Sequence, residues 1–196
     1  MLKIYGIPQS RAARCLWMAR ELGVEHENVP VHFRATRESP ELMKANPNAR
    51  IPAIECDGFT LYESMAINLY LAKKHGAGTP IAPASLEEEA LATQWSFWVM
   101  TEIEKPLLTL MLHEVGMRPA DAETLEKARA ELDRPLDVLE RHLAEQEWLM
   151  GGRFTVADLN VASVLAWAKP AKLDLSSRPH VEAWLKRCLG RPAFKG

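Results

Sequence analysis

The sequence has few cysteines, no long hydrophobic run and almost no net charge. Cys15, Cys56 and Cys188 are the three cysteines, and they form neither a CxxC motif nor a metal-ligand spacing. We therefore expect reduced thiols in a reducing compartment and no metal site. No apolar run approaches the roughly 18 residues of a membrane-spanning helix. Residues 1–5 do not resemble a secretion signal, so a cytoplasmic protein without membrane association is expected.

The charge balance argues against nucleic acid as a partner. The chain has 24 Lys and Arg against 26 Asp and Glu, a formal net charge of -2, and it has no run of basic residues. Binding to nucleic acid or to an anionic membrane depends on such clusters. A length of 196 residues allows one large domain or two small ones.

The first 77 residues alternate between short strand patterns and helical patterns. Asp57-Gly58 separates two strand patterns, and this pair favours the tight turn of a hairpin because both residues tolerate positive φ angles. The predicted order is βαβαββα, with strands at 2–5, 27–31, 51–55 and 59–62 and helices at 11–22, 40–45 and 64–74.

The remainder of the chain is predicted to be helical. Residues 78–85 have the composition of a linker, and residues 86–196 form a second, all-helical domain. Pro106 and Pro135 are expected to kink or interrupt their helices, since proline has no N–H to donate. The predicted helices span residues 86–112, 121–144, 155–167 and 179–189.

Three separated motifs resemble one known family. Residues 46–54, followed by the 57–58 turn and residues 61–71, look like the N-terminal domain of glutathione transferases. Residues 152–158 resemble the capping motif of that family's helical domain, and residues 10–23 resemble soluble bacterial, serine-type members of the theta- or beta-like kind. The resemblance covers nearly the whole chain in the correct order.

The resemblance implies a fold, an activity and partners. The fold would be a thioredoxin-like α/β domain at residues 1–77 followed by an all-α helical bundle. Glutathione would be the cosubstrate, and its thiolate would be conjugated to small hydrophobic electrophiles in detoxification by a homodimer. Two alternatives remain open: peroxidase or dehalogenase activity at the same site, and a binding module that has the fold without the chemistry.

Five residues are predicted to bind glutathione. In the family a cis-proline falls at Pro52, so that the backbone of Ile51 can pair with the peptide as one additional strand rung. Glu63 and Ser64 open a helix, where backbone N–H groups and the helix dipole favour the γ-glutamyl carboxylate. Arg50 is a candidate for the glycyl carboxylate, because a guanidinium binds a carboxylate through two hydrogen bonds.

Ser10 is the predicted catalytic residue. A thiol like that of glutathione has a pKa of about 8.5, and only its thiolate is a good nucleophile. A hydrogen bond from Ser10 to the sulfur is worth roughly 1.5–3 kcal/mol, or about one to two pKa units. Tyr5 and Arg11 are the alternatives for stabilising the thiolate. Cys15 lies on the apolar stripe of its helix and is expected to be a core residue.

The second substrate is expected to meet an apolar surface. One part would be the segment Ile7, Pro8 and Gln9, and the other part a long helix that carries Trp95, Trp98, Val99 and Glu102. Trp95 and Trp98 share one face of that helix, and packing in the core or between domains is the alternative role for these two residues. Thr155 and Asp158 have the spacing of a capping box, and we predict that their role is structural.

Overall fold

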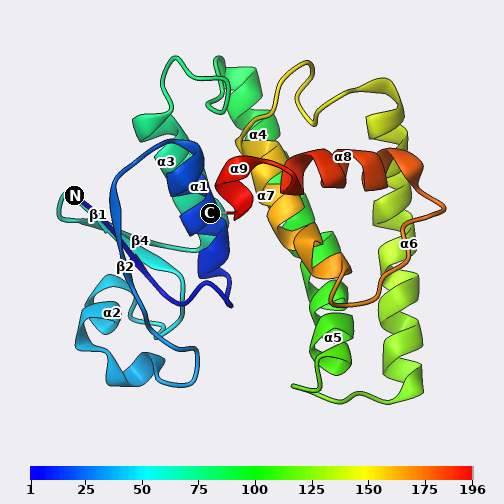
Figure 1. Ribbon diagram of the computed structural model, residues 1–196, viewed down its shortest axis with the longest axis horizontal. Coiled ribbons are helices and arrows are strands. Elements are labelled where there is room, and N and C mark those ends of the chain that lie inside the picture. The colour runs from blue at the N-terminus through cyan, green and yellow to red at the C-terminus, as the bar shows by residue number, and fades with distance from the viewer. Residues whose placement is uncertain (196) are drawn as a thin grey trace. The chain divides into compact units, whose positions relative to one another are not determined.

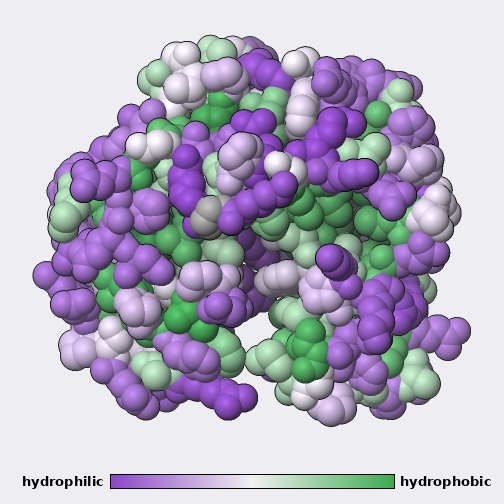
Figure 2. Space-filling view, in the orientation of Figure 1, coloured by the Kyte–Doolittle hydropathy of each residue, from purple (hydrophilic) through white to green (hydrophobic). Residues whose placement is uncertain are grey.

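The computed structural model describes residues 1–195 of the chain. It divides into two compact units, Met1–Ala84 with the residues from Pro192 onward, and Ser85–Arg191. The viewed face carries mainly hydrophilic residues, with hydrophobic ones in smaller areas between them (Figure 2). Within the described residues, every helix is too short or too polar to cross a membrane.

The first unit is built on a four-stranded sheet with the strand order β2-β1-β3-β4 (Figure 1). β2 pairs parallel to β1, whereas β3 and β4 are antiparallel to their neighbours. Asp57 and Gly58 form the hairpin turn with φ angles of 52° and 84°, as their sequence predicts. The elements are β1 (Leu2–Tyr5), α1 (Ala12–Glu21), β2 (His26–Val29), a short 3₁₀ turn (Thr36–Glu38), α2 (Pro40–Ala45), β3 (Ala53–Cys56), β4 (Phe59–Tyr62) and α3 (Ser64–His75).

Helices cover the sheet on both faces. Ile4 and Ile54 are paired across β1 and β3 and have no exposed surface, on the face that α1 and α3 cover. Tyr5 and Ala53 are paired on the opposite face, where they pack in one cluster with Leu42 of α2. Both faces of β1 are therefore core, which explains why its last two residues are both buried.

The end of the chain belongs to the first unit. The predicted helical domain extended to residue 196, but the structure packs α9 (Pro192–Lys195) against α1. The rings of Trp17 and Phe194 meet edge to face with centroids 4.9 Å apart, and Arg20 Nε donates a hydrogen bond of 2.7 Å to the Ala193 carbonyl. The Phe194 ring and the Ala193 carbonyl therefore hold α9 against α1.

The second unit is all helical. A π-helical turn (Val99–Ile103) interrupts the first predicted helix just ahead of Pro106, and it provides the local change in pitch that a proline near a helix start demands. The helix that contains Pro135 continues through this residue without interruption. The elements are α4 (Leu86–Trp98), α5 (Glu104–Glu114), α6 (Ala122–Glu145), α7 (Val156–Leu165), a short 3₁₀ turn (Ala166–Ala168) and α8 (Pro179–Leu189).

The Asp158 carboxylate organises the interior of the helical unit. One oxygen accepts hydrogen bonds from the Thr155 amide at 2.9 Å and from the Thr155 hydroxyl at 3.0 Å. The other oxygen accepts from the Leu149 amide and the Trp184 indole, both at 2.9 Å. Burial raises the pKa of Asp158, and the four donors counteract it. The capping box predicted from sequence is present, and it also binds α8 and the loop before α7.

We predict that Asp158→Ala lowers the free energy of unfolding by about 3–5 kcal/mol, because it leaves several buried donors without an acceptor. Urea denaturation followed by circular dichroism measures this loss. Asp174→Ala is the matched control: Asp174 is an exposed aspartate that accepts one hydrogen bond, from the Ser176 amide. It should cost less than about 1 kcal/mol, and equal losses for the two variants would contradict the role assigned to Asp158.

Candidate functional site

The segment before β3 presents a backbone edge. The Ile51–Pro52 peptide bond is cis, and within residues 1–195 the Ile51 amide and carbonyl have no hydrogen-bond partner. The buried Asn46 side chain holds the approach to this edge, because its Nδ2 donates to the Arg50 carbonyl at 2.8 Å. Arg50 itself is exposed. The sequence pattern places Asn46 only in a turn, whereas the structure gives it a part in positioning Ile51.

The start of α3 forms the second part of the site. Glu63 precedes the helix at a φ of 72° and is exposed, and Ser64 is its first residue and only 4% exposed. The positive φ turns the chain sharply from β4 into the helix. The unpaired N–H groups of the first helical turn and the helix dipole make this point favourable for a carboxylate.

Arg14 of α1 adds a positive charge next to the start of α3. Its guanidinium is buried, at 2% exposure, and Nη1 donates to the Ser64 hydroxyl at 3.3 Å. A hydroxyl that accepts from a guanidinium is a better donor to an anion, since the two hydrogen bonds polarise each other. Arg14 is not among the site residues predicted from sequence. The available signal was an arginine between Ala13 and Cys15, in a helix whose neighbouring positions are apolar.

Ser10 lies in the loop between β1 and α1 and is half-buried. Its hydroxyl donates to the Ile7 carbonyl at 2.7 Å and accepts from the Ala12 amide at 3.1 Å. Arg11 occupies the N-cap position of α1, so Ser10 supports the helix start from outside the helix. The single hydroxyl proton can be redirected to a ligand by rotation about the Cβ–Oγ bond, while the oxygen continues to accept from Ala12.

Tyr5 is a core residue. It is 2% exposed and packs with Val31 and Leu42, and burial is the main cause that raises the pKa of its phenol. The alternative in which Tyr5 activates a thiol therefore loses support, because a ligand cannot reach a side chain enclosed between the sheet and α2. Arg11 remains partly exposed. Cys15 has no exposed surface, and burial raises the pKa of its thiol far above the usual range.

The residues predicted to meet a second substrate separate into two groups. Ile7 is half-buried in the first unit, and Pro8 and Gln9 are exposed there. In the helical unit Trp95 is 6% exposed, in agreement with the core alternative, whereas the expectation for Val99 needs correction because this residue has no exposed surface.

The reason for the correction is the face on which these side chains lie. Trp95 of α4 contacts the ring of Trp98 at 5.1 Å and the ring of His142 of α6 at 5.0 Å. Val99, in the π-helical turn, follows Trp95 on this inward face. Trp95 and Val99 therefore belong to the core of the unit, while Trp98 is half-buried and Glu102 is exposed.

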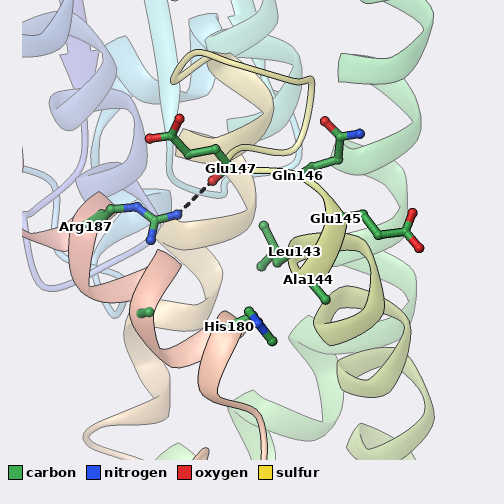
Figure 3. A pocket seen from close by; sticks show the side chains of 8 residues that line it. Leu143, Ala144, Glu145, Gln146, Glu147, His180 and Arg187 are labelled. Carbon is green, nitrogen blue, oxygen red and sulfur yellow. Dashed lines mark hydrogen bonds between the residues drawn. The ribbon is translucent and has the colours of Figure 1, made fainter.

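A separate hollow of about 280 Å³ lies in the helical unit where α6 ends beside α8. Figure 3 shows the Arg187 side chain directed at the Glu147 backbone, to whose carbonyl it donates at 2.8 Å. None of the residues predicted from sequence lines this hollow. Among residues 1–195 no group of three or more His, Cys, Asp or Glu is arranged to hold a metal ion.

Comparison with known families gives matches over both units. Residues 1–73 match the family model described as glutathione S-transferase, N-terminal domain. Residues 98–192 match the model described as glutathione S-transferase, C-terminal domain.

Individual relatives are similar along nearly the whole chain. Glutathione S-transferase 3 of Zea mays is 35% identical, covering 99% of this chain and 91% of the relative. Elongation factor 1-gamma of Rattus norvegicus is 30% identical over 98% of this chain, which corresponds to 45% of that protein.

Solved structures of glutathione transferases are also similar to this chain. Glutathione S-transferase III in its apo form has a TM-score of 0.84 and 34% identity, covering 99% of this chain and 94% of the other. The transferase URE2P6 of Phanerochaete chrysosporium, in complex with oxidized glutathione, has a TM-score of 0.86 and 27% identity, covering 99% and 93%.

We predict that Arg14→Met weakens the binding of glutathione, used here as a carboxylate-bearing probe, by about tenfold to a hundredfold. This range corresponds to one charge-assisted hydrogen bond of about 1.5–3 kcal/mol. Isothermal titration calorimetry measures the change. Arg20→Met is the control, since it removes a cation from the same helix at a position that contacts α9. Equal affinities of Arg14→Met and wild type would contradict the role assigned to Arg14.

Proposed function

The chain belongs to the glutathione S-transferase family, and on this premise we propose that it conjugates the thiolate of glutathione to small hydrophobic electrophiles. The observation that carries the proposal is that three junctions of one unit present groups that suit a peptide with a free carboxylate and a thiol. These groups are the backbone edge at Ile51, the start of α3 at Ser64 and the hydroxyl of Ser10 in the loop before α1.

Glutathione is proposed to bind along the Ile51 edge. The Ile51 amide and carbonyl pair with the cysteinyl backbone, as in the addition of a strand to a sheet. The γ-glutamyl carboxylate binds at the start of α3, to the Ser64 amide and hydroxyl, with Arg14 beneath the hydroxyl. Glu63 accepts from the α-ammonium group of the same residue. The exposed Arg50 is proposed to bind the glycyl carboxylate.

Ser10 is proposed to stabilise the thiolate. Its hydroxyl oxygen already accepts from the Ala12 amide, which makes the O–H a stronger donor. On binding, the proton that is donated to the Ile7 carbonyl turns to the sulfur of glutathione. The reaction is then attack of the sulfur on the electrophile, favoured because both reactants are held together. The exposed Pro8 and Gln9, next to Ser10, offer the electrophile a contact surface.

We predict that Ser10→Ala lowers kcat/KM for glutathione and a model aryl halide by about 10- to 100-fold, with a higher pKa for the bound thiol. The loss of one hydrogen bond to a charged group corresponds to about one to two pKa units. Steady-state kinetics and the pH dependence of thiolate absorbance measure the two effects.

Ser85→Ala is the matched control, because the Ser85 hydroxyl caps α4 by accepting from the Glu88 amide at 3.3 Å. This variant loses a comparable helix-start hydrogen bond but should retain activity. If Ser10→Ala keeps full turnover and an unchanged thiol pKa, Arg11→Ala becomes the next variant to measure.

A non-catalytic role is the second candidate. The similarity to elongation factor 1-gamma favours it, because a protein named as an elongation factor contains a segment that is 30% identical to this chain. Retention of the wild-type protein on immobilised glutathione without turnover of aryl halides or hydroperoxides would favour a binding module. Turnover that depends on Ser10 would favour the transferase.

A homodimer is also proposed, from the family. One chain has a mass of 22.0 kDa, so light scattering after size-exclusion chromatography is expected to give about twice this value. A particle of 22.0 kDa at micromolar concentration would contradict the dimer.

A further inference from the structure

A thiol and two amines meet where β3 ends beside the end of α3. Lys74 Nζ lies 3.2 Å from Cys56 Sγ and 2.7 Å from an Asp57 carboxylate oxygen. The α-amino group of Met1 binds the other oxygen of Asp57, and His75 Nε2 lies 3.9 Å from the same sulfur. None of these groups belongs to the glutathione site proposed above.

A cation and an anion both flank the Cys56 sulfur, because an Asp57 carboxylate oxygen lies 3.8 Å from the thiol and accepts from it. The Lys74 ammonium donates to both the carboxylate and the sulfur, and the hydrogen bond to Asp57 is the main cause that raises the pKa of Lys74. The same lysine is the main cause that lowers the pKa of Asp57. The proton of Lys74 is thus held beside the sulfur, where it can be delivered to a leaving group. Neighbouring cations are typical of reactive cysteines.

The other two cysteines lack this arrangement. Cys15 and Cys188 lie inside helices without exposed surface, and burial raises the pKa of both thiols far above the usual range. Cys56 is also buried, at 1% exposure, but it is followed directly by the exposed turn at Asp57 and Gly58. Of the three thiols, all in the described part of the chain, only Cys56 has an amine in contact.

We propose that Cys56 and Lys74 form a redox-modification site, at which a hydroperoxide oxidises the thiol and the lysine amine then condenses with the sulfur. The product is a sulfenamide cross-link between β3 and α3.

The chemistry balances in two steps. The Cys56 thiol gives its proton to the Asp57 carboxylate 3.8 Å away, and the sulfur attacks the terminal peroxide oxygen, so that an S–O bond forms and the O–O bond breaks. The sulfur is oxidised to sulfenic acid, the peroxide is reduced, and the leaving oxygen takes a proton from the Lys74 ammonium to become an alcohol or water. The neutral Lys74 amine then attacks the sulfur. An N–S bond forms, the S–O bond breaks, and the hydroxyl leaves with one amine proton as water.

The cross-link would join the distal ends of two elements that carry the proposed glutathione site at their proximal ends. β3 begins immediately after Pro52, and α3 begins at Ser64. Cys56 and Lys74 are separated by 18 residues in sequence. The experiment measures the cross-link itself by mass and does not depend on glutathione binding. A failure of the cross-link can therefore be distinguished from a failure of glutathione binding.

The experiment treats the reduced full-length protein with hydrogen peroxide and follows intact mass and peptide maps. The expected product has lost two hydrogens, yields one linked peptide pair containing residues 56 and 74, and returns to the starting mass with dithiothreitol. Lys74→Arg keeps the positive charge but has no primary amine. Oxidation of the Lys74→Arg variant should stop at a sulfenic acid on Cys56, which dimedone labels.

Lys73→Arg is the matched control, since it removes the neighbouring amine on the same helix and should leave the cross-link intact. Three outcomes would overturn the proposal. Cys56 could remain a thiol in the folded protein, Cys15 or Cys188 could oxidise at the same rate, or wild-type Cys56 could accumulate as a dimedone-reactive sulfenic acid without a link to Lys74.

Discussion

Coverage of the sheet on both faces is the constraint that decides which side chains of the first unit can meet a ligand. Because α1 and α3 cover one face and α2 the other, residues within the strands are enclosed, and Tyr5 is among them. Reactive groups can then emerge only where strands end and helices begin. Ser10, Ile51 and Ser64 all occupy such junctions, so the same coverage encloses Tyr5 and leaves these three residues at the ends of strands and the starts of helices.

Two buried polar side chains connect these junctions to the rest of the unit. Asn46 fixes the carbonyl of Arg50 ahead of the cis peptide, and Arg14 contacts Ser64 from the neighbouring helix. Buried polar groups hold a definite geometry because leaving them unsatisfied is costly. In the helical unit the buried Asp158 carboxylate has the same role, because it accepts hydrogen bonds from four donors. Precise positions thus depend on a few polar contacts within apolar surroundings.

The sequence predicted local features well where one residue type has one strong preference. The Asp57-Gly58 turn, the proline-led helix at 40–45 and the box at Thr155 and Asp158 are all of this kind. It failed where the outcome depends on distant contacts. The sequence places Val99 at an apolar second-substrate surface, but the π-helical turn and the packing around it leave the side chain without exposed surface. The partnership of Arg14 spans 50 residues and leaves no local periodicity.

The return of the final helix to the first unit has a consequence for the order of assembly. Trp17 is 1% exposed in the finished protein, and Phe194 provides one of its ring contacts. During synthesis the first 84 residues leave the ribosome well before residues 192–195 do. This part of α1 therefore stays uncovered while the helical segment is translated. The first unit is complete only when α9 packs on α1.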